Sequence, residues 1–252
     1  MYFCFIFGKI KKMKRIRATK QLLEKFKNDP ETLIFEGYCT NVDSVVIYNE
    51  GENYVLIANV NGGVKCCFKT DSEDFVWSVV NNLHYAQVEF CGVAPFITEI
   101  LRSKYDFIWE TNCYLYVWNG KPLSYQCVQH IRPMSAQFAQ KISDGTHYHA
   151  PVEEVVDVLS RHPSAAIYVD GKPICWCLLH LEKSLGMLYT EPEHRRKGYA
   201  LEVMTALCNM VIAQGDVPYA YIVTDNVASQ NLAAKYNLER VRPADYFAIK
   251  LN

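Results

Sequence analysis

The chain has 252 residues, half of them apolar and 21% charged, which is enough apolar material for a core and excludes a disordered protein. At this length we expect one large domain or two modest ones. The 26 basic and 27 acidic residues leave a net charge of −1, which excludes a general attraction of the whole molecule to nucleic acid.

The first 30 residues are the basic exception, with nine Lys and Arg against two acidic residues. Their spacing predicts a basic amphipathic helix from Lys14 to Lys27, whose charged face is either solvated or in contact with RNA or an anionic surface. Met13 and the residues after it are typical of a natural start, so we interpret residues 1–12 as an upstream extension.

The rest of the first half has the pattern of an α/β region. Residues 61–63, Asn-Gly-Gly, predict a hairpin turn, and Ser72 is expected to cap a helix. A second helix is expected at 95–104, and strands at 44–48, 54–60, 64–69, 85–90, 107–109 and 114–118. Residues 119–122 break the pattern, and there we place the boundary between a first domain, 1–123, and a second domain, 124–252.

The second half continues with alternating helices and strands. Helices are expected at 135–142, 152–161 and 227–235, and a long one follows residue 199 and ends at Gln214-Gly215. Strands are expected at 126–131, 165–169, 174–181, 185–190, 219–224 and 246–251.

Two places in the halves look alike. Tyr85-Ala-x-Val leads to a helix that ends in Lys104-Tyr-Asp-Phe, and Tyr219-Ala-x-Ile leads to one that ends in Lys235-Tyr-Asn-Leu. The likeness indicates either a duplicated fold with one degenerate copy or a chance similarity of two α/β segments, and both interpretations stay open.

The remaining composition argues against a membrane, disulfide or metal protein. No run approaches the roughly 18 apolar residues of a membrane span, and residues 2–7 lack the features of a secretory signal, so we expect a cytoplasmic protein without a membrane partner. The ten cysteines lie mostly in apolar runs without a Cys-x-x-Cys pair, which predicts buried, reduced thiols. His147 and His149 have a His-x-His spacing but no third ligand nearby, so no metal is expected.

The segment most informative about chemistry runs from residue 188 to 200, between a strand and an amphipathic helix. The first turn of a helix has N–H groups without partners and a partial positive charge, so it favours a bound anion. Gly198 and Ala200 let the chain approach a phosphate closely, and the three cationic residues 195–197 add charges, with forked donors on the arginines. We predict a pyrophosphate site here, although the spacing matches neither the dinucleotide nor the P-loop motif.

This segment resembles the pyrophosphate loop of the GNAT superfamily of acyl-CoA-dependent N-acyltransferases, Gln/Arg-x-x-Gly-x-Gly/Ala. The resemblance covers about residues 124–252 and includes Ile131-Arg-Pro and Asn226-x-x-Ser229. More narrowly, Pro173-Ile-Cys-Trp and the Leu188-Tyr-Thr-x-Pro-Glu run are similar to the glycine N-acyltransferase-like branch. The resemblance implies an α/β (α+β) fold with a mixed, mostly antiparallel central sheet flanked by helices, and a degenerate GNAT-like copy in the first half.

The resemblance also implies acetyl-CoA (coenzyme A) as acyl donor. In such folds the strand before the loop pairs with the pantetheine arm, the loop holds the pyrophosphate, and the start of the next helix reaches the arm where two strands splay apart. The implied binding residues are Leu188, Tyr189, Thr190, Arg195, Arg196, Lys197, Gly198, Tyr199, Ala200, Asn226 and Ser229.

The reaction asks for few residues, because holding a thioester and an amine together removes much of the barrier and a backbone N–H near Tyr189 can bind the thioester oxygen. An alkyl amine with a pKa near ~10 must still lose a proton, so a base helps. Ser184 stands where many family members place a glutamate base. Glu182, two residues earlier on the same strand face, is the candidate base acting through water, and His180 is a second candidate. Each of these two is also explained as an ordinary residue of a hairpin or sheet.

A general acid is expected less clearly. Ala233 occupies the position that often holds a tyrosine in the family, and Tyr236, three residues on, is the candidate substitute. A core role explains Tyr236 equally well, and a thiolate leaves without an acid.

The sequence therefore predicts a GNAT-type N-acetyltransferase, monomeric or homodimeric, acting on a primary amine of a small molecule or an amino acid. Two alternatives stay open: a CoA-binding sensor or scaffold with weak catalysis, suggested by Ser184 and Ala233, and an RNA-associated module that uses the basic first 30 residues.

Overall fold

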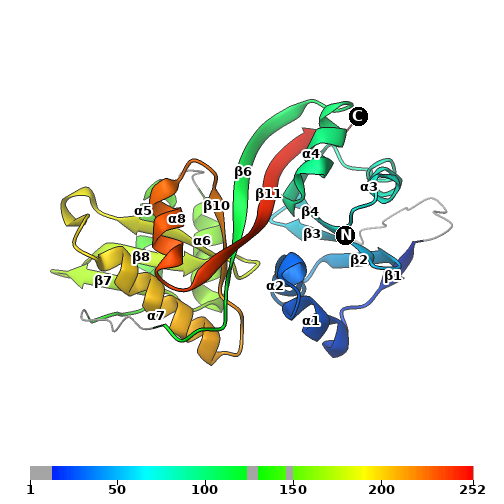
Figure 1. Cartoon of the computed structure of the whole chain (residues 1–252). Coiled ribbons are helices and arrows are strands. Elements are labelled where there is room, and N and C mark those ends of the chain that lie inside the picture. Colours follow the sequence, from blue (N-terminus) through cyan, green and yellow to red (C-terminus); the bar gives the residue numbers. More distant parts are fainter. Residues whose placement is uncertain (1–12, 124–129, 146–149, 252) are drawn as a thin grey trace. The chain divides into compact units, whose positions relative to one another are not determined.

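The computed structural model describes residues 13–123, 130–145 and 150–251 (Figure 1). The expected upstream extension, nearly all of the strand expected at 126–131, and the pair His147 and His149 lie outside these ranges. In the described part, Arg132 forms an isolated antiparallel bridge with Ala166.

The chain divides into two compact units. Unit 1 comprises Met1–Tyr114 with Arg242–Asn252, and unit 2 comprises Leu115–Val241. Two long strands, β6 (Phe107–Trp118) and β11 (Leu238–Lys250), each contribute residues to both units. The division into domains at residue 123 and the duplicated origin stay predictions.

The described part of unit 1 contains four α-helices and a series of β-strands. Its elements, besides parts of β6 and β11, are β1 (Lys14–Ile16), α1 (Lys20–Lys27), α2 (Leu33–Asn41), β2 (Val45–Glu50), β3 (Asn53–Val60), β4 (Gly63–Lys69), α3 (Glu73–Val80), β5 (Gln87–Val93) and α4 (Pro95–Arg102), with a short 3-10 turn at Pro30–Thr32. The hairpin turn at residues 61 and 62 is confirmed by the β3–β4 pairing, and the Ser72 cap by its side chain, which accepts from the Phe75 N–H.

The predicted helix from Lys14 to Lys27 is wrong in its first third. Residues 14–16 form β1, and Ile16 pairs with Ile47 of β2. The helix begins only at Lys20, because the Thr19 side chain accepts from the Leu22 N–H at 3.2 Å and caps it there. The spacing of charges predicted a longer helix, but it carries no information about a partner strand 31 residues away.

Helices cover both faces of the unit 1 sheet. On one face α3 and α4 pack on a core of β2–β5 and β11 that includes Val55, Phe90 and Phe247, all fully buried. On the other face Phe26 of α1 lies against Phe35 of α2 and Tyr54 of β3, with ring centroids 5.3 and 5.5 Å apart. Burial of these aromatic rings on alternate faces explains why β3 is apolar along its length.

Unit 2 contains the segment singled out by sequence. Its elements are α5 (Ala139–Gly145), α6 (Val152–Arg161), β7 (Ala165–Val169), β8 (Lys172–Leu179), β9 (Leu185–Thr190), α7 (Tyr199–Ala213), β10 (Tyr219–Val223) and α8 (Val227–Ala234), with short 3-10 turns at Ala136–Phe138 and Pro192–His194. Helix α7 packs on β8, with Val203, Leu207 and Cys208 buried against that strand's apolar side chains.

The sheets have the mixed, mostly antiparallel character predicted, flanked by helices. The larger sheet has the order β1-β2-β3-β4-β5-β11-β6-β10, and the smaller one the order β7-β8-β9. Strand β9 contacts β10, yet each ends a different sheet. The two strands are therefore in contact although they are not hydrogen-bonded neighbours in one sheet.

Two further observations bear on the composition. All eight cysteines in the described part are free thiols, and seven of them are buried as expected. Among the residues placed by the structure, no helix is long and apolar enough to cross a membrane.

Candidate functional site

The turn between β9 and α7 has a backbone shaped by two left-handed residues. Arg196 has φ 59° and Gly198 has φ 84°. Gly198 is the N-cap of α7 and offers no side chain, so the first N–H groups of this 15-residue helix have no side-chain cap. A Cβ at Gly198 would meet no atom within 4 Å, so its conformation, and not crowding, requires glycine here.

The three cations of this turn differ in what they contact. Arg195 donates through Nε to the carbonyl of Thr190 at 2.9 Å, and its guanidinium lies 5.7 Å from the centroid of the Tyr189 ring. Arg196 and Lys197 are exposed and take part in no ion pair with any residue that the structure describes. Arg195 therefore braces the end of β9, and the other two leave their charge available to a bound anion.

Strand β9 has a bulge just before the turn. Trp176 pairs with Tyr189 and Leu178 pairs with Gly186, so β9 holds one residue more than β8 between these pairs. Met187 has φ 50° there, a conformation uncommon outside glycine. The extra residue interrupts the β8–β9 ladder in the middle of the strand, where backbone groups can turn toward another partner.

The side chains after the bulge alternate between two environments. Tyr189 stacks on Trp176 with centroids 4.9 Å apart, and Gly145 lies against both rings. The Thr190 hydroxyl lies 3.1 Å from the Cys175 thiol. Leu188 is half-buried. The predicted binding strand thus has its side chains packed, and its outer backbone edge is the part that faces β10.

Asn226 stands at the start of α8, just after β10. Its Oδ1 accepts from the N–H of Ser229 at 3.0 Å and caps the helix. The family pattern Asn-x-x-Ser is therefore explained locally as a helix cap. The amide nitrogen of Asn226 is the group left to donate to a ligand between the two strands.

The catalytic candidates Glu182 and Ser184 lie in the turn between β8 and β9, not on one strand face as the sequence suggested. Ser184 Oγ donates to Glu182 Oε1 at 2.6 Å, and both side chains are buried, with Glu182 9% exposed. The hydroxyl of Tyr219 donates to the Glu182 carbonyl. The turn is thus built around one carboxylate, and a hydrogen bond rather than strand alternation brings the pair together.

The comparisons with known proteins agree with this geometry. Residues 170–245 match the family model described as FR47-like protein. A Drosophila protein of known structure aligns over 95% of this chain and 98% of its own, with a TM-score of 0.73 and 14% identity. A protein described as a GNAT-family acetyltransferase from Novosphingobium aromaticivorans aligns over 79% of this chain and 88% of its own, with a TM-score of 0.58 and 13% identity. The chain has the GNAT fold.

One further GNAT structure is informative about the length of the chain. A tandem GNAT protein from the clavulanic acid biosynthesis pathway aligns over 95% of this chain and 98% of its own, with a TM-score of 0.51 and 10% identity. The similarity to solved GNAT structures therefore extends through unit 1 as well as unit 2. No curated protein sequence matches the chain, and the narrower resemblance to the glycine N-acyltransferase-like branch stays a prediction.

Tyr236, the candidate acid, lies after the end of helix α8. Helix α8 ends at Ala234, and the chain turns so that the Tyr236 ring is 2% exposed. Its hydroxyl has no hydrogen-bond partner among the residues that the structure describes, and burial raises its pKa far above the usual value, with Cys177, Cys208 and Cys175 nearby. Ala233 is buried beside it at 2% exposure.

Sequence reasoning missed several residues around the Glu182 turn. Tyr219 holds the turn from β10, and Lys183 pairs with Asp216 at 3.1 Å. Burial lowers the pKa of His162, and this histidine also forms a hydrogen bond with the backbone of Leu181. No local signal identifies Tyr219, Asp216 and His162 as neighbours of the turn, because each of them comes from a distant part of the sequence.

One missed residue did carry a signal. A Cβ at Gly186 would lie 2.0 Å from Nε2 of His180, so the imidazole of this second base candidate packs directly on the glycine. An isolated glycine inside an apolar strand is typical of such close approach. Within the described ranges, no group of three or more His, Cys, Asp or Glu side chains could hold a metal ion.

Proposed function

We propose that this chain is an acyl-CoA-dependent N-acyltransferase that moves an acyl group, acetyl as the first choice, to a primary amine of a small molecule or an amino acid. The observation that carries the proposal is the corner between β9 and α7. It joins β9, which lies at the edge of its sheet, to a helix start with no side-chain cap and to two cations, Arg196 and Lys197, that form no ion pair with the described residues. An extended ligand with a diphosphate at one end fits such a corner.

The binding roles follow from the atoms that are left to bind. The N–H groups of residues 196–200 and the charges of Arg196 and Lys197 would hold the pyrophosphate. The backbone of Leu188, Tyr189 and Thr190 would pair with the pantetheine arm, with Asn226 donating from α8. The acyl donor supplies an activated acyl group, whose C–S bond breaks as the C–N bond to the amine forms.

The protein's own residues would then have to stabilise the thioester oxygen, remove a proton from the acceptor ammonium and return a proton to the leaving sulfur. A backbone N–H near Tyr189, beside the bulge, would bind the thioester oxygen as it gains charge. The ammonium form of the acceptor must lose a proton, and Glu182 would take it through water, with His180 as the second candidate. Tyr236, whose hydroxyl has no partner, is the candidate to return a proton to the leaving sulfur.

A second function, a CoA-binding sensor, is favoured by particular observations. One carboxylate oxygen of Glu182 is already engaged by Ser184, and Ala233 is buried at the position where many family members place the acid. Both features would reduce turnover without affecting the corner that binds the donor.

Thiol release from acetyl-CoA across a panel of primary amines and amino acids separates the two functions. We expect an amine-dependent rate above the hydrolysis background. A parallel melting experiment with CoA, acetyl-CoA and longer acyl-CoAs reports binding alone, because a ligand at 100 times its Kd adds about 2.7 kcal/mol of stability. Binding with no turnover on any amine would favour the sensor, and no binding by any CoA would reject both. The cytoplasmic location and the monomeric or homodimeric state stay predictions.

A further inference from the structure

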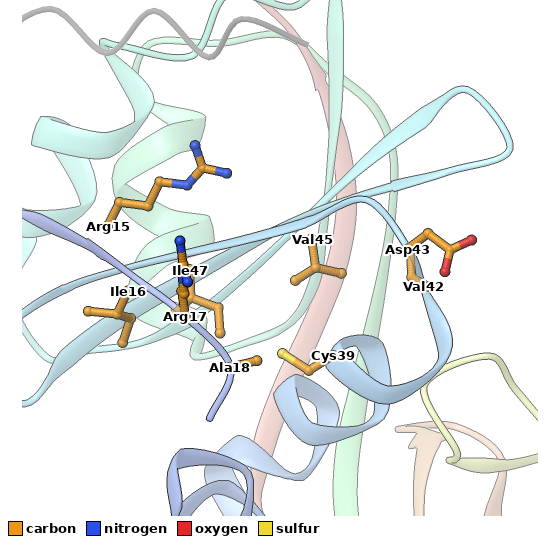
Figure 2. Close-up of a pocket in the computed structure, with 9 residues that line it drawn as sticks. All are labelled: Arg15, Ile16, Arg17, Ala18, Cys39, Val42, Asp43, Val45 and Ile47. Carbon is orange, nitrogen blue, oxygen red and sulfur yellow. The ribbon is translucent and has the colours of Figure 1, made fainter. Parts of the chain in front are cut away.

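A cavity of about 590 Å³ lies in unit 1, between β1, the end of α2 and the start of β2 (Figure 2). Its volume is within the range of small-molecule sites, about 300–1,000 Å³. All its lining residues lie between positions 15 and 47, so it belongs to unit 1 alone and has no part in the proposed acyl transfer.

One side of the cavity is basic and unpaired. Several described cations of unit 1 form ion pairs, for example Lys25 with Glu52 and Lys65 with Glu89. Arg15 and Arg17, which line the cavity, form none with the residues that the structure places, and both are exposed. The charges of these two arginines are therefore available to a ligand in this cavity.

Another part of the lining is apolar. It is formed by Val42, Val45, Ile47 and the thiol of Cys39. Burial raises the pKa of the Cys39 thiol to about 12, so the thiol stays uncharged at neutral pH. Figure 2 shows the arginines at one end and Asp43 at the other, so the lining carboxylate does not neutralise them at close range.

We propose that this cavity binds an organic anion with an apolar body. Arg15 and Arg17 would hold a carboxylate or phosphate, whose oxygens match the forked guanidinium donors. Val42, Val45 and Ile47 would cover the hydrocarbon part, because removing apolar surface from water is favourable. A carboxylate and a phosphate share this chemistry, and the probes below distinguish them.

The test measures binding to the full chain by calorimetry with matched probes. Octanoate, octyl phosphate and octylamine share a chain and differ in charge, whereas acetate and inorganic phosphate keep the charge without the chain. We expect octanoate or octyl phosphate to bind, and the tighter of the two identifies the head group. Octylamine, acetate and inorganic phosphate should bind at least about 10-fold more weakly.

The variant Arg15→Gln with Arg17→Gln should weaken the binding probe about 10-fold or more, because it removes the charge-assisted hydrogen bonds to the head group. Lys20→Gln is the control, because Lys20 is an exposed cation near these arginines that does not line the cavity. Equal binding of octylamine, or unchanged binding in the double variant, would overturn the proposal. A short single-stranded RNA that binds and is weakened equally by all three substitutions would overturn it too, because the patch would then serve nucleic acid.

Discussion

The two halves of the chain order their elements in the same way but differ at the place where a ligand would bind. From the helix pair α1–α2 and from the pair α5–α6, each half continues with three strands, a helix, a strand, a helix and a strand. In unit 1, β4 and β5 pair in parallel through Lys65–Glu89 and Cys66–Phe90. In unit 2, the corresponding β9 and β10 end separate sheets. The shared order supports the proposed duplication.

The turns that follow β4 and β9 also differ. Lys69 ends β4 and pairs with Asp29 and with Glu31, and Ser72 caps the following helix with its own side chain. The turn after β9 instead has Gly198 at the cap, and its Arg196 and Lys197 form no ion pair with the described residues. The strand-end cation and the helix start thus have partners within unit 1, whereas the corresponding groups of unit 2 are available to a ligand. A ligand site in this fold therefore requires helix-start N–H groups and cations that have no internal partner, and substitutions at these groups test the difference between the two units.

The largest expected effect concerns the turn before β9. Unit 1 has a turn without a carboxylate, Asn61-Gly62, in the corresponding place, and Glu182→Gln would remove the carboxylate from the turn of unit 2. If Glu182 is the base, kcat should fall by about 100-fold or more, as removal of a general base does, with the Kd for CoA unchanged. Steady-state kinetics and calorimetry measure the two quantities.

Glutamine can still accept from Ser184, so the turn should keep its structure and the parent's melting temperature serves as the control. An unchanged kcat would remove Glu182 from the mechanism. The same measurements on His180→Gln would then decide whether the second candidate is the base.

The next effect concerns the helix start. Gly198→Glu places a Cβ on a residue with φ 84° and a negative charge beside the predicted pyrophosphate site. We expect the affinity for CoA to fall by about 100-fold or more, because at least two charge-assisted hydrogen bonds would be lost. Isothermal calorimetry with CoA measures this change.

Gly171→Glu is the matched control. Gly171 also has a positive φ, 76°, open space around its Cβ and a place in a turn of unit 2. Both variants carry the same backbone strain, and only the first should lose CoA. Equal CoA binding by Gly198→Glu and the parent would leave the acyltransferase proposal without its main support.

Local signals were what made parts of this fold predictable. The hairpin at Asn61-Gly62, the cap at Ser72 and the helix Val152–Arg161 depend on residues within a few positions, and all three are confirmed. Strand β11 is longer than expected, Leu238–Lys250 instead of 246–251. Its pairing with β5 covers only Asp245–Lys250, and its other neighbour in the sheet is β6, so a distant strand accompanies the additional residues.

The site divides in the same way. The turn at Arg196 and Gly198 was found because its motif is continuous in sequence. The arrangement around Glu182 was not, because the sequence argument treated 182–184 as strand and could not include Tyr219, 37 residues away. The buried surroundings of the Tyr236 hydroxyl were also not predictable from the sequence, because they depend on where α8 ends and on cysteines of β8 and α7.

A smaller effect concerns Tyr236 itself. A buried hydroxyl without a partner is destabilising, so Tyr236→Phe should raise the free energy of unfolding by about 1 kcal/mol. Chemical denaturation at pH 7 measures it. A loss of kcat in the same variant would indicate that the hydroxyl finds its partner in the reaction, and lower stability would show that it is already bonded in the free protein.

The pH dependence gives Tyr236 a second readout. Burial raises the pKa of this phenol above its unfolded value of 10.0, so the folded state keeps its proton when the unfolded state begins to lose it. Ionisation of this phenol therefore leaves the free energy of unfolding unchanged below pH 10 and lowers it progressively above pH 10. Between pH 10 and 11 the parent should therefore lose more stability than Tyr236→Phe.

The smallest effect compares one lysine from each half. Burial alone would lower the pKa of Lys69, but hydrogen bonds and charges of Asp29 and Glu31 outweigh it and raise the pKa. Lys69→Gln should therefore cost about 1 kcal/mol of stability, the upper range for a partly exposed ion pair, without effect on CoA binding. Lys197→Gln should leave stability unchanged within about 0.5 kcal/mol and weaken CoA binding several-fold, with a shallower salt dependence. Lys197→Gln could instead destabilise the fold and leave CoA binding intact. Lys69 and Lys197 would then both have a structural role, and the proposed difference between the turns after β4 and β9 would be wrong.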